Sequence, residues 1–184
     1  MPRSHAGTYA DVLRHDLSAF IHRSFIELNG ATKYLGNWHV ELIAMKLEEV
    51  RLGKCKRLII NVPPRHLKSH ATSVVFPAWI LGHHPSKQIM FMTYGQDLSE
   101  SFALKCRTLM ESSFYTGLFD TRLSSRALSE LTTTKGGALL STSLGGGITG
   151  RGADYIIIDD PLKADDALSE LRRNAVNTTY GHLE

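Results

Sequence analysis

Residues 61–69, with the sequence NVPPRHLKS, end in a lysine and a serine, as phosphate-binding loops do. In such a loop the lysine ammonium binds the β- and γ-phosphate oxygens, and the hydroxyl that follows it binds Mg²⁺. The pattern GxxxxGK(S/T) matches here at Lys68 and Ser69, but Val62 and Leu67 stand at its two glycine positions. Taken alone, this segment is as consistent with the ordinary start of a surface helix as with a phosphate site.

A second segment that could carry chemistry is the pair Asp159-Asp160, which directly follows the apolar run 155–158. In phosphate hydrolysis one carboxylate at the end of a buried strand holds the Mg²⁺ shell, and the next orients or deprotonates the attacking water. Asp-Asp-Pro is also ordinary turn chemistry. The two segments together favour a nucleotide site over a chance combination.

The shape of a loop without glycine depends on its other residues. Pro63 and Pro64 have a fixed φ and no N–H donor, so a backbone cradle for phosphate must come from residues 65–69. Arg65 lies within this cradle, where a guanidinium can reach a phosphate. Another arginine, Arg151, follows the glycine-rich stretch SLGGGITG. It could reach a phosphate of its own site or of a neighbouring subunit, or it could be a solvated loop arginine.

The histidines and cysteines do not form a recognisable metal-binding pattern. No histidine pairs with a carboxylate at a suitable spacing, so we expect solvated loop histidines at His66, His70, His83 and His84. Cys55 and Cys106 are far apart and lack CxxC spacing, which argues against a disulfide framework or a cysteine zinc site and fits a reducing cytoplasm.

The hydrophobic pattern predicts the elements that must position these residues. Helices are predicted over residues 8–28, 38–51, 69–79 and 96–111, the third being kinked or ended early by Pro77. Strands are predicted over residues 57–62, 88–94, 138–142 and 154–158, the first of them buried on both faces. The Ser- and Thr-rich connection 112–137 leaves room for a short hairpin. This alternation predicts an α/β fold with a mostly parallel sheet flanked by helices on both faces.

The length and composition of the chain limit the kinds of protein that it can be. A chain of 184 residues, 42% hydrophobic and 21% charged, can bury one substantial core and is expected to form one domain. The formal net charge of +3 is compatible with a polyanionic partner without requiring one. No apolar run approaches the length of a membrane span or forms a signal-peptide core, so we expect an intracellular protein without a membrane partner.

From about Trp38 onward the chain resembles the N-terminal ATPase portion of the large terminase subunits, the DNA-packaging motors of tailed bacteriophages and prophages. The resemblance rests on the motifs PPRHLKS, FPAWILG, MTYGQDLSESFA, GITGRGAD and IIIDDPLKADDALSE. In that family the glycine-poor loop is a known variant of the phosphate-binding motif. The resemblance therefore implies a RecA-like P-loop NTPase fold that binds ATP and Mg²⁺.

The resemblance also implies roles for individual residues. Lys68 and Ser69 would bind phosphate and Mg²⁺, Asp159 would hold the metal, and Asp160 would take the place of the catalytic carboxylate. Arg65 would sense the γ-phosphate, and Arg151 matches the position from which some relatives supply an arginine finger to the neighbouring subunit. The expected nucleotide-binding residues are Pro64, Arg65, His66, Leu67, Lys68 and Ser69, with Trp38 and His39 as candidates for the adenine pocket.

The implied partners are double-stranded DNA, a portal protein, a small terminase subunit and further copies of the chain in a homo-oligomeric ring, all in the bacterial cytoplasm. Such proteins usually continue into a coupling motif and an RNase H-like nuclease domain, and neither is seen before Glu184. We therefore expect one ATPase domain, truncated on its C-terminal side, with an N-terminal helical region over residues 1–52 and an incomplete P-loop core over residues 53–184. We expect that this chain does not cleave DNA and that it does not hydrolyse ATP at the rate of a motor.

Three alternatives remain open. One is another nucleic-acid-dependent P-loop ATPase, such as a helicase-like enzyme. Another is a catalytically incomplete prophage fragment that acts as an assembly or interaction module. The third is a Mg²⁺ nuclease built on Asp159, Asp160 and Lys163, which is poorly supported because these residues lie on one turn without a further acidic strand.

Overall fold

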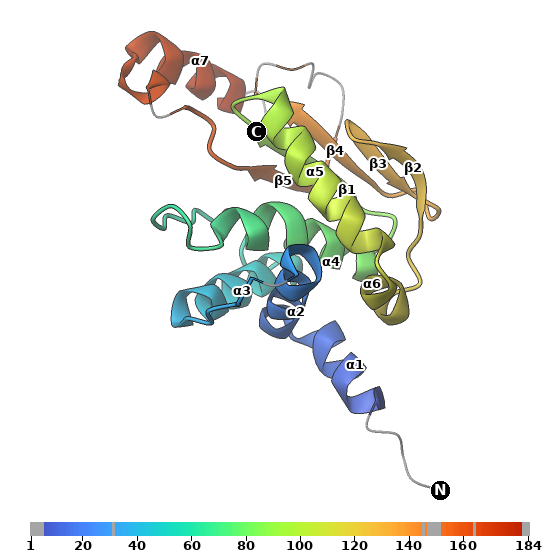
Figure 1. Ribbon diagram of the computed structural model, residues 1–184. Coiled ribbons are helices and arrows are strands. Elements are labelled where there is room, and N and C mark those ends of the chain that lie inside the picture. The colour runs from blue at the N-terminus through green and yellow to red at the C-terminus, as the bar shows by residue number, and fades with distance from the viewer. Residues whose placement is uncertain (1–5, 31, 145, 147–151, 164, 182–184) are drawn as a thin grey trace, which may run out of the picture.

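The N-terminal part of the chain is helical in the computed structural model, which describes residues 6–30, 32–144, 146, 152–163 and 165–181 (Figure 1). Helix α1 spans Ala6–His15, α2 spans Leu17–Asn29 and α3 spans Trp38–Arg51. The prediction for α3 is confirmed, whereas the single helix predicted over residues 8–28 is wrong. Asp16 has extended backbone angles, and its carboxylate accepts a hydrogen bond from the Ala19 N–H at 3.0 Å. An aspartate in this geometry starts a new helix, although the apolar pattern continues through it.

A five-stranded mixed sheet, in the order β2-β3-β4-β1-β5, forms the other half of the molecule. Strands β1 (Gln88–Thr93), β4 (Ala138–Ser143) and β5 (Tyr155–Ile158) are parallel to one another. Strands β2 (Leu123–Ala127) and β3 (Glu130–Thr133) form an antiparallel hairpin that extends the sheet beyond β4. The α/β class is confirmed, and the expected mostly parallel sheet is mixed because the hairpin joins it.

Residues 57–62 do not form the predicted strand that is buried on both faces. The side chains alternate, with Leu58, Ile60 and Val62 packed against the core and Ile59 85% exposed. Within the described part of the chain, the backbone groups of residues 58–62 make no backbone hydrogen bond. An apolar run forms a strand that is buried on both faces only where neighbouring strands pair with it in a sheet. Here β5 pairs with β1, and no described strand pairs with residues 57–62.

The helix that follows the loop is longer than predicted. It continues from the π-helix η1 (His70–Val75) into α4 (Phe76–His83). Pro77 lies in the first turn of α4, where the missing N–H interrupts no α-helical bond. The Phe76 N–H donates to the Ala71 carbonyl, one residue further back than in an α-helix. The predicted early end is therefore wrong, because the change of helix type accommodates the proline.

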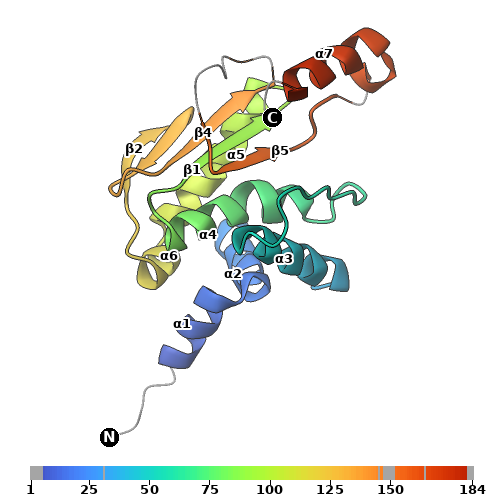
Figure 2. The same cartoon turned by 180° about the vertical axis from the view of Figure 1, so that it is seen from behind.

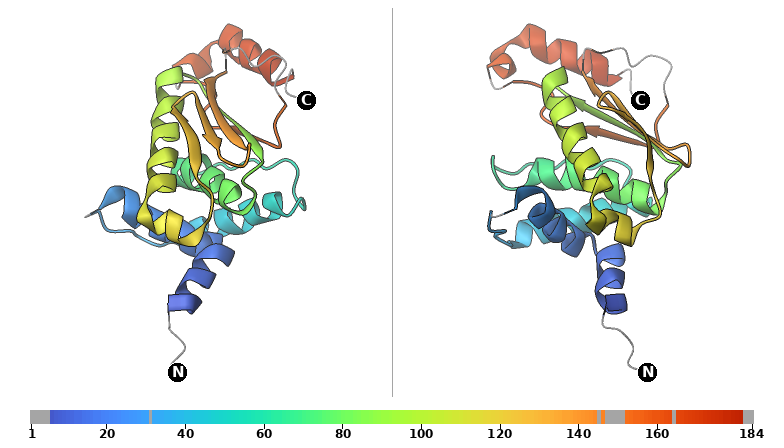
Figure 3. Two further views of the ribbon diagram at one scale, coloured as in Figure 1. Left: turned by 90° about the vertical axis from the view of Figure 1, so that its right-hand side faces the viewer. Right: turned by 45° about the vertical axis from the view of Figure 1, so that its right-hand side comes forward.

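The helix η1–α4 lies between the sheet and the N-terminal helices (Figure 3). This position explains why the segment FPAWIL is buried on all sides, which a surface helix never is. On the face of the sheet that meets it, Ile89, Phe91 and Leu139 join the main core, which α5 (Gln96–Glu111) also covers. The bounds predicted for α5 are confirmed.

The opposite face of the sheet is only partly covered (Figure 2). Met90, Met92 and Leu144 form a small second cluster there, against which Val176 packs. Val176 belongs to α7 (Glu170–Gly181), which follows the short 3₁₀-helix η2 (Asp166–Leu168). The remaining helix, α6 (Ser113–Leu118), connects α5 to the hairpin. Among the helices that the structure describes, none has the length and apolar character needed to cross a bilayer.

Candidate functional site

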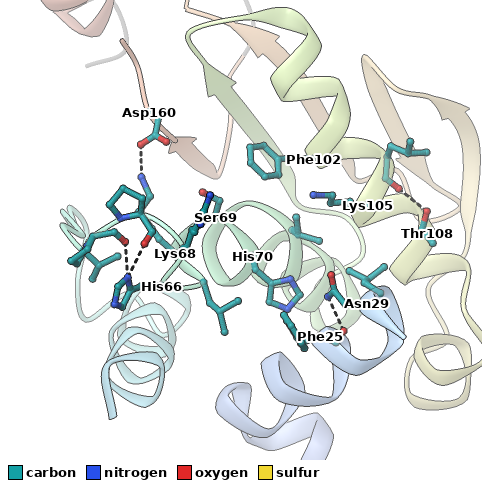
Figure 4. A pocket seen from close by; sticks show the side chains of 18 residues that line it. Phe25, Asn29, His66, Lys68, Ser69, His70, Phe102, Lys105, Thr108 and Asp160 are labelled. Atoms are coloured by element: carbon teal, nitrogen blue, oxygen red, sulfur yellow. Dashed lines mark hydrogen bonds and ion pairs between the residues drawn. The ribbon is translucent and has the colours of Figure 1, made fainter. Parts of the chain in front are cut away.

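The two segments singled out in the sequence meet in the structure. The Lys68 Nζ lies 2.8 Å from Oδ1 of Asp159 and 2.5 Å from Oδ1 of Asp160, the second contact being drawn in Figure 4. The Asp159 side chain is only 4% exposed, whereas that of Asp160 is 58% exposed. A buried carboxylate is tolerable only with a charged, hydrogen-bonded partner, and Lys68 supplies it. The site therefore combines a buried acid, an exposed acid and one ammonium.

The chain conformation after β5 explains how two adjacent carboxylates reach the same lysine. The Asp159 N–H still bonds to the Met92 carbonyl at 2.9 Å, as if the strand continued. Asp160 then adopts a left-handed conformation with φ of 46°, and its carbonyl accepts a bond from the Tyr94 N–H at 3.2 Å. Neighbouring side chains on an extended strand point to opposite faces. The left-handed residue breaks that alternation, and aspartate tolerates this conformation better than most residues.

Although the loop contains no glycine, two of its residues adopt the left-handed backbone conformation that glycine usually provides. Arg65 has a φ of 66°, and Leu67, at the second glycine position of the pattern, has a φ of 62°. Each such residue costs about 1–2 kcal/mol relative to a right-handed conformation. Backbone strain of this kind persists only where the surroundings impose it, and it concentrates at functional sites.

Contacts around His66 hold this strained loop. Its Nδ1 lies 3.1 Å from the Pro63 carbonyl oxygen and 2.9 Å from that of Pro64. The His66 carbonyl oxygen is in turn 3.2 Å from Nε2 of His39, at the start of α3. The loop is thus tied both to itself and to an N-terminal helix.

Ser73 is a site residue that the sequence analysis missed. Its hydroxyl donates to Oδ2 of Asp159 at 2.7 Å, and the side chain is almost fully buried. The hydroxyl predicted for the site was that of Ser69, which lines the cavity beside Lys68. The sequence did contain one indication of this role: Ser73 follows Ser69 by four residues, about one helical turn, which places both serines on the same side of a helix. Asp159 is therefore engaged at both oxygens, by Lys68 and by Ser73.

The electrostatics keep Lys68 charged. Burial alone would lower the pKa of its ammonium, but the hydrogen bonds and charges of Asp159 and Asp160 outweigh burial and raise the pKa above its ordinary value. For Mg²⁺, the hydroxyl of Ser69 and the two carboxylates are hard oxygen donors of the kind this ion prefers. The residues therefore fit a phosphate group together with a magnesium ion.

A cavity of about 820 Å³ contains most of the predicted site residues. The predicted residues that line it are Pro64, Arg65, His66, Leu67, Lys68, Ser69 and Asp160. Trp38 and His39 are not among the lining residues, and Trp38 is 70% exposed, so their assignment to an adenine pocket stays a prediction. Arg151 lies outside the described residues.

The far part of the cavity involves residues that the sequence analysis did not select. They come from α2, η1 and α5, and they are Phe25, Leu28, Asn29, His70, Val74, Phe102, Leu104, Lys105 and Thr108. No sequence motif distinguishes them, because their spacing is that of ordinary amphipathic helices.

His70 and His83 are not the solvated loop histidines that the sequence suggested. His70 is half-buried in η1, where its Nε2 lies 3.4 Å from the Ile21 carbonyl oxygen and its ring contacts Phe25 edge-on. Burial lowers the pKa of His70 to about 4. His83 is half-buried in α4, and burial likewise lowers its pKa.

The low pKa of His70 predicts acid sensitivity. Below pH 6.5 the unfolded chain binds a proton at this residue that the folded chain binds only near pH 4, so stability should fall as the pH decreases through this window. The expected contribution between pH 7 and pH 5 is up to about 2 kcal/mol. Urea unfolding of the wild type and of His70→Gln at both pH values measures it, with exposed His84→Gln as the control. An equal pH effect in wild type and His70→Gln would contradict the prediction.

Comparison of the chain with protein-family models and with curated proteins gave no match. The described residues also contain no cluster of three or more histidine, cysteine, aspartate or glutamate side chains arranged to hold a metal ion. The functional conclusion therefore depends on the geometry around Lys68 and on the sequence motifs.

Proposed function

We propose that this chain is a Mg²⁺-dependent ATP-binding and ATP-hydrolysing domain, the motor domain of a phage terminase large subunit that drives double-stranded DNA into procapsids. One observation carries the proposal. Lys68, at the end of a strained loop without glycine, contacts both carboxylates at the end of β5. The loop that was predicted to bind phosphate and the aspartate pair that was predicted to hold Mg²⁺ and orient water thus lie together, beside a cavity large enough for a nucleotide.

In this proposal the residues of the loop bind the phosphates. The backbone N–H groups of residues 65–69 and the Lys68 ammonium face the phosphate oxygens, and Arg65, which lines the cavity, approaches the γ-phosphate. Mg²⁺ would be held by Ser69 and Asp159, where it supplies positive charge to the β- and γ-phosphate oxygens. Ser73 keeps Asp159 oriented through its hydrogen bond.

Asp160 is the candidate for the residue that orients the attacking water. Its carboxylate is exposed, adjoins the cavity and is paired with Lys68. A phosphate that binds the Lys68 ammonium would compete with Asp160 for it, and the weakened contact would leave a carboxylate oxygen of Asp160 better able to accept a proton from water. The same lysine would therefore couple nucleotide binding to activation of the acid.

The sequence resemblance extends the proposal to partners. It suggests a ring of chains on a portal protein, a small terminase subunit, and Arg151 as a finger for the neighbouring subunit. A second candidate function is an assembly module that binds nucleotide without turning it over. The observation that favours it is that residues 58–62, which lead into the loop, make no backbone hydrogen bond within the described residues, because an unpaired segment positions a catalytic loop poorly.

The experiment that tests the proposal combines calorimetric titration with a phosphate-release assay. MgATP should bind at one site per chain, binding should weaken when EDTA removes Mg²⁺, and double-stranded DNA should increase phosphate release. Binding without release, with or without DNA, would instead support the assembly module. A chain that is folded by circular dichroism and binds no MgATP would refute both candidates.

A further inference from the structure

The cavity beside Lys68 continues well beyond the space that phosphates need. Its volume of about 820 Å³ is in the range of sites that enclose a whole small molecule. From the loop it extends along η1 and between α2 and α5 (Figure 4). One end is thus lined by the loop and Asp160, and the other by three helices.

The walls of the helical end are largely apolar and aromatic. Phe25 and Phe102 both line it, together with Val74 of η1. The ring of Phe25 contacts His70 edge-on with centroids 5.5 Å apart, and that of Phe102 contacts Phe91 in the same way at 5.7 Å. Edge-on contacts of this kind hold the rings in place. The helical end therefore offers two positioned aromatic rings against which a flat, apolar ligand group could pack.

The rim of this end offers a small set of polar atoms. The Thr108 hydroxyl donates to the Leu104 carbonyl at 2.9 Å, and the Asn29 amide nitrogen donates to the Phe25 carbonyl at 2.8 Å. The hydroxyl oxygen of Thr108 and the amide oxygen of Asn29 therefore remain able to accept hydrogen bonds. The Lys105 Nζ lies 5.6 Å from the Phe102 ring centroid, and no carboxylate of the described residues pairs with it. The rim thus presents acceptors and one charged donor around an apolar slot.

We infer that the nucleoside part of the bound nucleotide lies between α2 and α5, against Phe25 and Phe102, with Lys105 and Thr108 at its polar edge. This inference rests on the proposed function, since the phosphates are taken to lie at Lys68. A nucleobase has a flat apolar face and an edge of alternating donors and acceptors, which matches the slot and its rim. Trp38 lies outside the cavity lining, so this placement differs from the adenine pocket suggested by the sequence.

The test separates the nucleoside from the phosphates by comparing MgATP with magnesium tripolyphosphate, which has no nucleoside. Thr108→Trp places a large ring at the helical end from an exposed position on α5, and Ser101→Trp places the same ring at an exposed position of α5 outside the lining. Thr108→Trp should weaken MgATP binding about tenfold or more, because the new ring occupies the space of the nucleoside, and should leave tripolyphosphate binding unchanged. Ser101→Trp should change neither. Lys105→Ala, which adds no volume, should weaken MgATP binding alone.

Each of the other possible outcomes would overturn the inference. If Thr108→Trp and Lys105→Ala bind MgATP as the wild type does, while binding still requires Lys68, the inference is overturned and the proposed function stands. A selective loss of MgATP binding in Trp38→Ala would then place the nucleoside at α3 instead. If Thr108→Trp weakens both ligands equally, the helical end is not a separate nucleoside subsite. If the wild type binds neither ligand, the proposed function fails and the inference fails with it.

Discussion

Replacing Lys68 with alanine is expected to remove MgATP binding at concentrations that saturate the wild type. A charge-assisted hydrogen bond to phosphate is worth about 1.5–3 kcal/mol. The substitution also leaves the carboxylates of Asp159 and Asp160 uncompensated beside the phosphates, which adds repulsion. Together these effects predict a loss of affinity of about a hundredfold or more.

A matched control for this variant exists elsewhere in the chain. Lys87 pairs with Asp154 at 2.7 Å at the opposite end of β1, away from the cavity lining. Lys87→Ala therefore removes a similar lysine–aspartate pair and should retain the wild-type affinity. Titration calorimetry on both variants, at a temperature where circular dichroism shows each to be folded, makes the comparison. Wild-type affinity in Lys68→Ala would place the phosphates somewhere other than the loop.

The two adjacent aspartates should differ sharply in their contribution to stability. Asp159→Ala removes a buried carboxylate, leaves the Ser73 hydroxyl without this acceptor and leaves Lys68 with Asp160 alone, which should cost about 2–3 kcal/mol. Asp160→Ala removes an exposed partner of the same lysine and should cost less than about 1 kcal/mol. Urea unfolding at pH 7 measures both values.

The same pair of variants separates the roles of the aspartates in function. Under the proposed function, Asp160→Ala should still bind MgATP but release phosphate far more slowly, because only the water-orienting group is lost. Asp159→Ala should lose the Mg²⁺ dependence of binding. Equal stability losses in the two variants would show that Lys68, Asp159 and Ser73 do not form the buried network described above.

Local patterns in the sequence were sufficient to predict where several helices and strands lie along the chain. The bounds of α3 and α5 follow from the spacing of their apolar residues, and β1, β4 and β5 follow from short apolar runs. The break between α1 and α2 was also available locally, since Asp16 is a strong N-cap residue. It was missed because the apolar spacing continues across it.

Pairing between strands could not be predicted in this way. Residues 57–62 have the composition of a strand buried on both faces, yet the described structure provides no strand to pair with them. The hairpin of β2 and β3 adds antiparallel strands to a sheet that the alternation of elements suggested to be mostly parallel. Strand composition determines a tendency to pair, whereas the partner depends on segments that are distant in sequence.

For the site, the sequence by itself determined the chemical groups: a lysine and a serine at the end of a loop, and two carboxylates after an apolar run. Only the tertiary structure decided that Lys68 touches both carboxylates, that Ser73 rather than Ser69 bonds to Asp159, and that the cavity continues between α2 and α5. The reason is physical. Residue type sets the chemistry available, but the direction of each side chain depends on the left-handed turn at Asp160 and on the helix type of η1, and packing over the whole chain determines both.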